Sequence, residues 1–231
     1  MKIPLSHRLQ VCCSLIQPGD RVADVGTDHG YLGIWLLNAG IARSVIASDV
    51  VPGPLSAAKR NAEKFGFLDK MSFYLSDGVQ NIPKDFDTLV CAGMGADTMI
   101  SILEQGQWLK DPRYRLVLQC QSKAPMLRSY LSREGYRIRR ELVLRDGKFL
   151  YTVMEVIFEP GHPLSSAECY FSPALLENTG EELREYIWRV MEGLQQAAAH
   201  RSDPELTTLL EELNRNPRII RLKENTNGNC Q

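Results

Sequence analysis

The sequence predicts an α/β fold: a mostly parallel sheet with a late antiparallel hairpin, followed by a C-terminal helical hairpin. Over the first 160 residues, short apolar runs alternate with helical patterns, and this alternation is typical of βαβ units around a parallel sheet. Residues 161–231 carry helical periodicity instead. We therefore predict two domains, residues 1–160 and residues 161–231, which meet at the Pro- and Gly-containing segment Glu159–Pro163.

Seven short apolar runs are the expected strands of the sheet. In chain order they are Arg21–Val25, Ser44–Ser48, Met71–Leu75, Thr88–Ala92, Leu116–Gln119, Ile138–Val143 and Phe149–Phe158. The helical patterns between them are Tyr31–Asn38, Pro54–Phe65, a helix that begins within Thr98–Leu103, and Leu127–Arg133. The Asp146-Gly147 pair is a hairpin-turn signal, so the last two strands are expected to pair antiparallel and make the sheet mixed.

Two amphipathic helices are expected in the C-terminal part. Apolar residues recur at helical spacing from Leu183 to Leu194 and again from Leu206 to Leu213. Asp203 and Pro204 between them have the residue types of an N-cap and a first helical position. The sequence therefore predicts an αα-hairpin, with a polar and disordered tail over Asn225–Gln231.

Composition limits the classes of protein that fit. Apolar residues make up 44% and charged residues 24% of the chain, as in globular proteins. No apolar run approaches the ~18 residues of a membrane-spanning helix, and residues 1–20 lack a signal-peptide pattern, so we expect a cytoplasmic protein without a membrane partner. The six cysteines form no C-x-x-C pair, so we expect no metal site, and Cys12 and Cys13 are expected to be buried thiols.

The charge balance favours no particular partner. Residues 1–160 hold 20 Lys and Arg against 17 Asp and Glu, and residues 161–231 hold 7 against 11. A local basic patch is still compatible with nucleic-acid binding.

Acidic residues and glycines follow successive predicted strands. Asp24 ends the first strand, and Gly26 and Gly30 lead into the next helix, a turn that lets backbone approach a ligand. Asp49 ends the second strand, where an acid can accept hydrogen bonds from ribose hydroxyls. Asp77 follows the third strand. Each feature alone is compatible with an ordinary turn, but together they favour a nucleoside-like ligand at the carboxyl edge of the sheet.

The Ala92-Gly-Met-Gly95 segment after the fourth strand leaves backbone exposed where another group can approach, although a tight turn explains it equally well. The sequence contains neither a G-x-x-x-x-G-K-[ST] phosphate loop nor a G-x-S-x-G nucleophile elbow. P-loop phosphoryl transfer and triad hydrolysis are therefore disfavoured.

This pattern of acids and glycines resembles class I S-adenosylmethionine-dependent methyltransferases. More closely, the sequence resembles the bacterial methyltransferases that modify N1 of the adenine at tRNA position 22. The matching stretches are Leu5–Leu9, Ala23–Leu32, Gly53-Pro54, Ala58-Lys59, Gly78 and Ala92–Gly95.

The resemblance implies a Rossmann-like sheet in the order 3-2-1-4-5-7-6, with S-adenosyl-L-methionine over its carboxyl edge and tRNA as the partner. The cofactor's methionine would lie near Asp24, Gly26 and Asp28, its ribose near Asp49 and Val50, and its adenine near Asp77 and Gly78. Gly93, Met94 and Gly95 would border the sulfonium and the target base. A monomer or weak homodimer is expected.

Chemistry and resemblance together name further candidates. Asp28 is the candidate for stabilising the cationic product base, and the other interpretation is an N-cap of the helix at Tyr31–Asn38. His29 is the second catalytic candidate, for orienting the loop or contacting RNA, and a capping or packing histidine is the alternative. Tyr31 or Met94 is a candidate for stacking on the base, and a place in the core explains both equally well. Candidate RNA contacts are Arg8, Gln121 and the basic stretch Arg128, Arg133, Arg137, Arg139, Arg140 and Arg145; a solvated charged face explains that stretch equally well.

The sequence also departs from the family pattern. It has Asp49 where relatives commonly have Glu, Ala96 where they have Gly, and Leu118-Gln-Cys-Gln121 where they have Leu-Gln-Pro-Asn. Two alternatives therefore stay open: the same fold acting on another RNA, a small molecule or a protein, and a cofactor- or RNA-binding module without activity.

Overall fold

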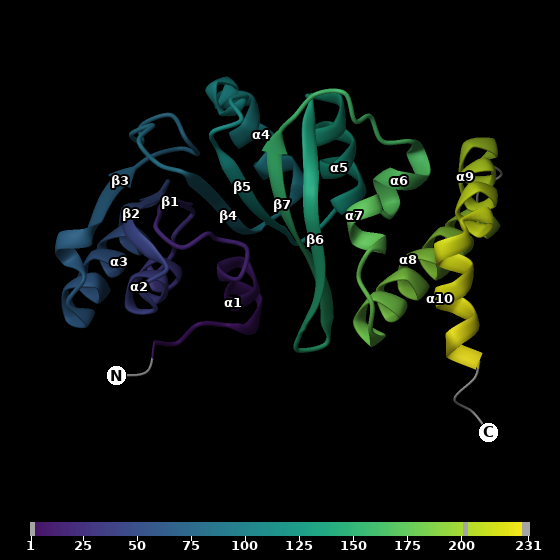
Figure 1. Cartoon of the computed structure of the whole chain (residues 1–231), viewed down its shortest axis with the longest axis horizontal. Coiled ribbons are helices and arrows are strands. Elements are labelled where there is room, and N and C mark those ends of the chain that lie inside the picture. Colours follow the sequence, from purple (N-terminus) through teal and green to yellow (C-terminus); the bar gives the residue numbers. More distant parts are fainter. Residues whose placement is uncertain (1–2, 201–202, 228–231) are drawn as a thin grey trace.

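The computed structural model describes residues 3–200 and 203–227 and is built around one seven-stranded sheet (Figure 1). The strand order is β3-β2-β1-β4-β5-β7-β6, which confirms the predicted order. The strands are β1 (Asp20–Val25), β2 (Ala42–Asp49), β3 (Met71–Leu75), β4 (Thr88–Met94), β5 (Arg115–Cys120), β6 (Tyr136–Asp146) and β7 (Phe149–Phe158). The helices of the sheet-forming part are α1 (His7–Cys13), α2 (Tyr31–Asn38), α3 (Pro52–Phe65), α4 (Ala96–Gln105) and α5 (Ala124–Arg133), with short 3₁₀ turns η1 (Leu68–Lys70) and η2 (Gln107–Leu109).

Strands β1 to β5 are parallel, and β7 is antiparallel to both of its neighbours, β5 and β6. The mixed sheet and its late hairpin are therefore as predicted. The strand order reverses between β1 and β4. Open α/β sheets bind ligands at such a reversal, outside the carboxyl ends of the strands.

Helices cover both faces of the sheet because side chains alternate along each strand. In β5, Leu116 and Leu118 pack in one buried cluster with residues of α4 and α5. Val117 belongs to the opposite cluster, with residues of α1, α2 and α3. The two layers bury nearly continuous apolar strands, as expected for a parallel sheet.

The C-terminal part is larger than the predicted hairpin. It contains α6 (Ser166–Tyr170), α7 (Pro173–Leu176), α8 (Glu181–His200), α9 (Pro204–Arg215) and α10 (Pro217–Asn227). The predicted pair is α8 and α9, with Asp203 as the N-cap that accepts from Glu205 N and Leu206 N. The prediction omitted α10, which begins at Pro217 and buries Ile219 and Leu222 against the other two helices.

The predicted disordered tail is wrong for residues 225–227, which end α10; residues 228–231 lie outside the described part. Helix α1 was not predicted either. Ser6 caps it by accepting from Leu9 N, and its Cys12 and Cys13 are buried as expected. Burial raises the pKa of the Cys12 thiol to about 12, so this thiol stays protonated. Within residues 3–200 and 203–227, no helix is long and apolar enough to cross a membrane.

Candidate active site

The loop after β1 is shaped by three residues in the left-handed region. Gly26, Asp28 and Gly30 have φ of 76°, 47° and 74°. Gly30 is the N-cap residue of α2, so the alternative interpretation of Asp28 as the cap is wrong. Side chains at such φ are strained unless they are short and polar, and Asp is among the tolerated types. The loop is therefore an open turn that leaves the Asp28 carboxylate exposed to solvent.

Asp24 lies beneath this loop and is buried. Thr27 Oγ1 donates to Asp24 Oδ2 at 2.6 Å. Gly26 N and Thr27 N donate to Ser48 O at 2.8 and 2.9 Å, which ties the loop to β2. Thr27 was not among the predicted site residues, although its place three residues after an acid at a strand end was a signal.

The pKa of Asp24 is raised to about 6: burial is the main cause, the hydrogen bond from Thr27 lowers the pKa, and the nearby carboxylates of Asp49 and Asp28 add to the rise. The structure thus gathers Asp24, Asp28 and Asp49 at one corner. The sequence pattern predicted Asp24 and Asp49 at a common edge, and the resemblance added Asp28. Three carboxyl groups there give the site a negative potential, which favours a cationic ligand group.

Asp49 ends β2 beside β1, and Asp77 lies two residues beyond β3. Asp49 Oδ1 accepts from Val51 N at 2.8 Å, and its neighbour Val50 is exposed. Gly78 has φ of 57°, and a Cβ there would lie 2.8 Å from Gln105 Oε1 on α4. Asp24, Asp49 and Asp77 therefore lie at the carboxyl ends of three neighbouring parallel strands, at one edge of the sheet. Carboxylate groups at this edge are suited to accept hydrogen bonds from hydroxyl donors.

The Gly93–Gly95 segment belongs partly to β4, which continues to Met94 past an irregularity in its pairing with β5. The predicted end of this strand at Ala92 was too early. Gly93, with φ of 80°, donates from its backbone N to Gln119 Oε1 at 2.9 Å. Arg8 Nη1 donates to the same oxygen at 2.8 Å.

Gln119 is fully buried, and it was not among the predicted site residues. The available signal was one amide side chain in the apolar run Leu116–Cys120, because buried polar groups need partners. Arg8, predicted to contact RNA, is also within 3.8 Å of Asp146 through its Nε.

The β1 and β4 loops touch each other at Gly26. A Cβ there would collide with the terminal methyl of Met94, and the φ of 76° independently favours glycine at this position. The segment after β5 closes on the same place, since Gln121 N donates to Met94 O at 2.8 Å and Ala96 N to Ser122 O at 3.2 Å. The Gln121 side chain is exposed at this rim.

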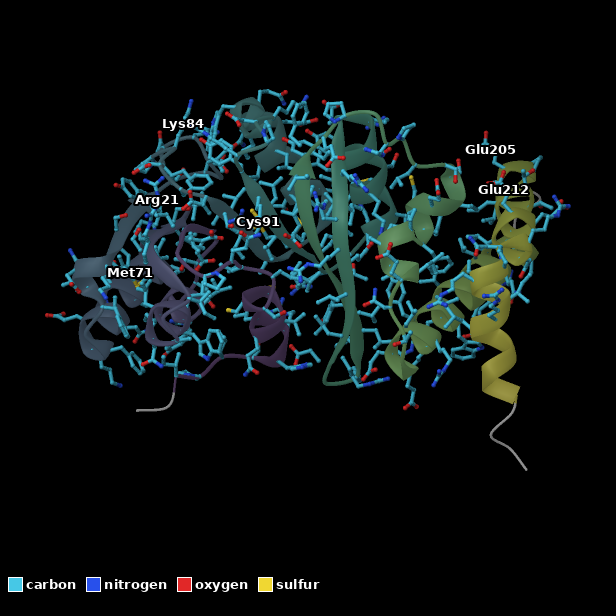
Figure 2. All side chains as sticks on the ribbon, in the orientation of Figure 1. Arg21, Met71, Lys84, Cys91, Glu205 and Glu212 are labelled. Atoms are coloured by element: carbon cyan, nitrogen blue, oxygen red, sulfur yellow. The ribbon has the colours of Figure 1, made fainter. Side chains whose placement is uncertain are left out.

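Figure 2 shows Cys91 of β4 near the middle of the molecule, far from Glu205 and Glu212 on α9.

Comparison with known proteins identifies this arrangement. Residues 5–154 match the family described as a methyltransferase domain. The chain belongs to this methyltransferase family. It is 34% identical over 154 residues to the tRNA (adenine(22)-N(1))-methyltransferase of Bacillus subtilis, and this alignment spans 66% of this chain and 65% of that protein.

Solved structures extend the similarity over nearly the whole methyltransferase. The crystal structure of the B. subtilis M1A22 tRNA methyltransferase has a TM-score of 0.78 at 28% identity, covering 96% of this chain and 99% of that one. A candidate tRNA (m1A22) methyltransferase of Streptococcus pneumoniae, crystallised with S-adenosyl-L-methionine, has a TM-score of 0.80 at 28% identity, with coverages of 96% and 99%. The predicted resemblance and fold class are confirmed.

In this methyltransferase, Asp28 and His29 lie together at the mouth of the site. Asp28 Oδ1 is 3.5 Å from His29 Nε2, and both side chains are exposed. The His29 ring lies 6.0 Å from that of Tyr31, centroid to centroid. Asn61 of α3 donates to His29 O at 2.9 Å and so holds the loop. These side chains are accessible to a substrate, and their catalytic roles stay predictions.

The predicted basic stretch does not gather at this site. Arg128 is fully buried and pairs with Glu141 at 2.7 Å, so its predicted contact with phosphate is wrong. Arg137 pairs with Glu159 at 2.5 Å, and Arg139 lies 3.8 Å from the same carboxylate. Arg137 and Arg139 lie in the first half of β6, and Arg133 ends α5 just before it, so the three are near the amino edge, opposite the acids.

A hollow of about 430 Å³ lies at this amino edge of the methyltransferase. Arg137, Arg139 and His162 are among its lining residues. This hollow is remote from the acidic corner. Open α/β sheets bind their ligands outside the carboxyl ends of the strands, so the hollow is not the expected cofactor site. Among the described residues, no three His, Cys, Asp or Glu side chains gather as a metal site requires.

Proposed function

We propose that this methyltransferase transfers a methyl group from S-adenosyl-L-methionine to N1 of an adenine in tRNA, at position 22. The observation that carries the proposal is the contact of the Gly26–Gly30 loop with Met94, in a chain that aligns with the Bacillus subtilis tRNA (adenine(22)-N(1))-methyltransferase. The resemblance implies that the Asp28-His29 loop and the Ala92–Gly95 segment take part in methyl transfer. In the fold these two segments are neighbours, because Gly26 lies against Met94.

The residues present fit the cofactor. Without a Cβ, Gly26 and Gly93 let Met94 and Arg8 lie against the backbone of the site, and Ser48 Oγ is buried without a hydrogen-bond partner. Asp24 with Asp28 would hold the cationic methionine end, and Asp49 the ribose hydroxyls. When bound, S-adenosyl-L-methionine supplies an electrophilic methyl group. Asp77 and Gly78 are the proposed contacts of its adenine.

The chain's own task is to align the acceptor and to stabilise charge. No strong base has to be supplied, because N1 of an unpaired adenine has a free lone pair, so the turn at Gly93–Gly95 contributes mainly position. Methylation leaves a cationic base, and the exposed Asp28 carboxylate stabilises that charge as it develops. Tyr31 and Met94 are the side chains proposed to stack on the flipped base.

A tRNA substrate implies that the protein works in the cytoplasm, and a monomer or weak homodimer is the state we propose for it. Arg8 and Gln121 lie at the rim where RNA would enter. Gln121 with Cys120 replaces the family's Asn and Pro. Cys120 Sγ donates to Ser122 O at 3.0 Å, so this rim is held by the chain itself.

The deciding experiment is transfer from radiolabelled S-adenosylmethionine to unmodified bulk tRNA, followed by separation of the product nucleosides. We expect labelled 1-methyladenosine, and its loss from a tRNA whose position 22 is not adenine. Another methylated nucleoside would redirect the proposal to another acceptor. Cofactor binding without transfer to any RNA would favour the inactive module.

The variant Asp28→Ala tests the role of the exposed carboxylate in this assay. At saturating S-adenosylmethionine, which removes the effect of weaker cofactor binding, we expect its kcat to fall by about 100-fold, since a group that stabilises developing charge is worth roughly 3 kcal/mol. Asp69→Ala, at an exposed position on η1, is the matched control. An Asp28→Ala enzyme with wild-type kcat would remove Asp28 from the mechanism.

A further inference from the structure

The β6–β7 hairpin projects beyond its neighbours on the same edge as the acidic corner. Strand β7 is antiparallel to both β5 and β6, so β6 runs in the direction of β5 and ends at the carboxyl edge. The pairing of β7 with β5 stops at Thr152 opposite Cys120, whereas its pairing with β6 continues to Phe149 opposite Asp146. Three residues of β7 therefore extend past β5, a reach of about 10 Å.

Two aromatic rings on this projection lie in a row between two cations, one at the hairpin tip and one on α1. Lys148 Nζ lies 5.4 Å from the centroid of the Phe149 ring. The rings of Phe149 and Tyr151 are 6.1 Å apart, on one face of β7 because side chains alternate along a strand. Arg8 Cζ lies 5.9 Å from the Tyr151 ring. We call these four residues the cation–aromatic ladder.

The ladder leads to the turn assigned to methyl transfer. Its last member, Arg8, shares the Gln119 Oε1 acceptor with the backbone N of Gly93. A continuous series of side-chain contacts therefore connects the exposed hairpin tip to the segment that would border the target base.

The hairpin is held from two sides. On the α1 side, His7 Nδ1 lies 3.1 Å from Arg145 O, and Arg8 lies near Asp146. On the α8 side, Arg189 Nη1 donates to Lys148 O at 3.3 Å, and Arg145 pairs with Glu185. A projection fixed in this way can present a surface without paying for ordering on binding.

The tip side chains are free to bind, unlike the basic stretch predicted from the sequence. Phe149 is 53% exposed. Arg137, Arg140 and Arg145 each have a carboxylate partner, but in the part of the chain that the structure describes no carboxylate oxygen lies within 4.0 Å of Lys148 Nζ. An unpaired ammonium beside an exposed ring suits a phosphate and a stacked base.

We propose that the cation–aromatic ladder is the docking surface for the RNA strand next to the target base, with a base on Phe149 and a phosphate on Lys148. This inference rests on the proposed function, since it names where the substrate of that site lies. RNA is favoured as the occupant because unpaired bases stack on aromatic rings and on Arg planes, and because the ladder is continuous with the proposed methyl-transfer turn.

The test compares Phe149→Ala, Phe149→Tyr and Lys148→Gln with wild type. Phe149→Ala should weaken tRNA binding at least about fivefold, the lower end for loss of one stacked base, while its dissociation constant for S-adenosylmethionine is unchanged. Phe149→Tyr should restore binding, because the ring returns. Lys148→Gln should lower the slope of log affinity against log salt by about 1, as expected for one lost phosphate contact.

Lys84→Gln is the matched control, because Lys84 also lies over an aromatic ring, with its Nζ 5.0 Å from the Trp108 centroid. Lys84 lies before β4, on the side of the molecule away from the hairpin tip (Figures 1 and 2). This variant should bind tRNA with wild-type affinity and salt dependence. An equal effect of Lys84→Gln would mean that general positive charge, and not the ladder, holds the RNA.

The outcomes separate this inference from the proposed function. If wild type methylates tRNA and all three hairpin variants bind tRNA as wild type does, the ladder is not the docking surface and the proposed function stands. If wild type neither binds nor methylates tRNA, the proposed function fails first. A changed oligomeric state of Phe149→Ala in light scattering, without a change in tRNA affinity, would overturn the inference in favour of a contact between copies of this chain.

Discussion

At the scale of single residues, Asp24 shows how burial prepares this site for a cation. Its carboxyl group is buried, accepts from Thr27, and has Asp28 and Asp49 as acidic neighbours. A group with a raised pKa is costly to ionise until a positive charge is placed beside it. A cationic ligand group at this corner therefore gains binding free energy from neutralising the three carboxylates.

This arrangement predicts a pH dependence of stability. The folded state holds the Asp24 proton up to about pH 6, whereas the ordinary pKa of an Asp carboxyl group is 3.8. The stabilising contribution of this proton is fully present below pH 3.8 and is lost as pH rises through 6, a change of about 3 kcal/mol. For Asp24→Asn, which cannot ionise, we expect Tm relative to wild type to rise between pH 4.5 and pH 7.5 in thermal unfolding.

Asp77→Asn, at an exposed position, is the control for this measurement. The Tm of Asp77→Asn relative to wild type should not show the rise between pH 4.5 and pH 7.5 that is expected for Asp24→Asn. A difference between Asp24→Asn and wild type that is constant with pH would show that the pKa of Asp24 is not raised.

At the scale of elements, Gln119 connects three of them. Its Oε1 accepts from Arg8 of α1 and from Gly93 of β4, and the residue itself lies in β5. One buried amide thus determines how α1 and the β4 loop sit against the sheet. Substitution by an apolar side chain would leave two donors without an acceptor, which costs free energy for each.

We therefore expect Gln119→Leu to lose about 1–3 kcal/mol of unfolding free energy, measured in urea, and to lower the single-turnover rate with bound cofactor. Gln119→Glu keeps the acceptor and should retain a faster rate than Gln119→Leu. Gln107→Leu on η2, at an exposed position, is the control and should keep both quantities at wild-type values. Equal rates for both Gln119 variants would limit Gln119 to a role in stability.

At the scale of the whole molecule, a buried ion pair joins the sheet to the C-terminal helices. Arg128 of α5 pairs with Glu141 of β6, and both side chains are inaccessible to solvent. Arg128 Nη1 also donates to Cys169 O and Tyr170 O at 3.0 and 2.9 Å, and Ser172 Oγ donates to Glu141 Oε2 at 2.6 Å. The predicted division at residue 160 thus lies next to a shared buried network.

Breaking the Arg128–Glu141 pair should lower the free energy of unfolding strongly. Arg128→Met leaves the Glu141 carboxylate buried without its cation, and such changes cost about 3–5 kcal/mol. The double variant Arg128→Met/Glu141→Leu should recover part of that loss, since no charge is then buried alone. Urea unfolding followed by tryptophan fluorescence measures both, and a double variant no more stable than the single one would contradict this account.

The same experiment tests the predicted domains. Because the network spans the division, we expect wild type to unfold in one transition. Two transitions in wild type would show that residues 1–160 and residues 161–231 unfold independently.

The sequence was informative where structure depends on local pattern. Alternating apolar runs located the seven strands to within a few residues, and Asp24, Asp49 and Asp77 were expected at one edge because parallel strands share their carboxyl ends. The family motifs supplied the strand order, which local periodicity does not determine. The positions of the strands and the common edge of the acids, in contrast, follow from neighbours along the chain and from the direction of each strand.

Only the tertiary structure decided which polar groups meet. Arg8 and Gln119 are 111 residues apart, and Arg128 reaches the helical part through carbonyls 41 and 42 residues away. The periodicity of apolar residues along the chain does not specify such pairs. A buried, paired arginine and an exposed one therefore cannot be distinguished within a basic stretch of sequence. The sequence by itself therefore determined the sheet and its ligand-binding edge, whereas the folded chain decided which charges are neutralised and which remain free, because burial and pairing depend on contacts between distant segments.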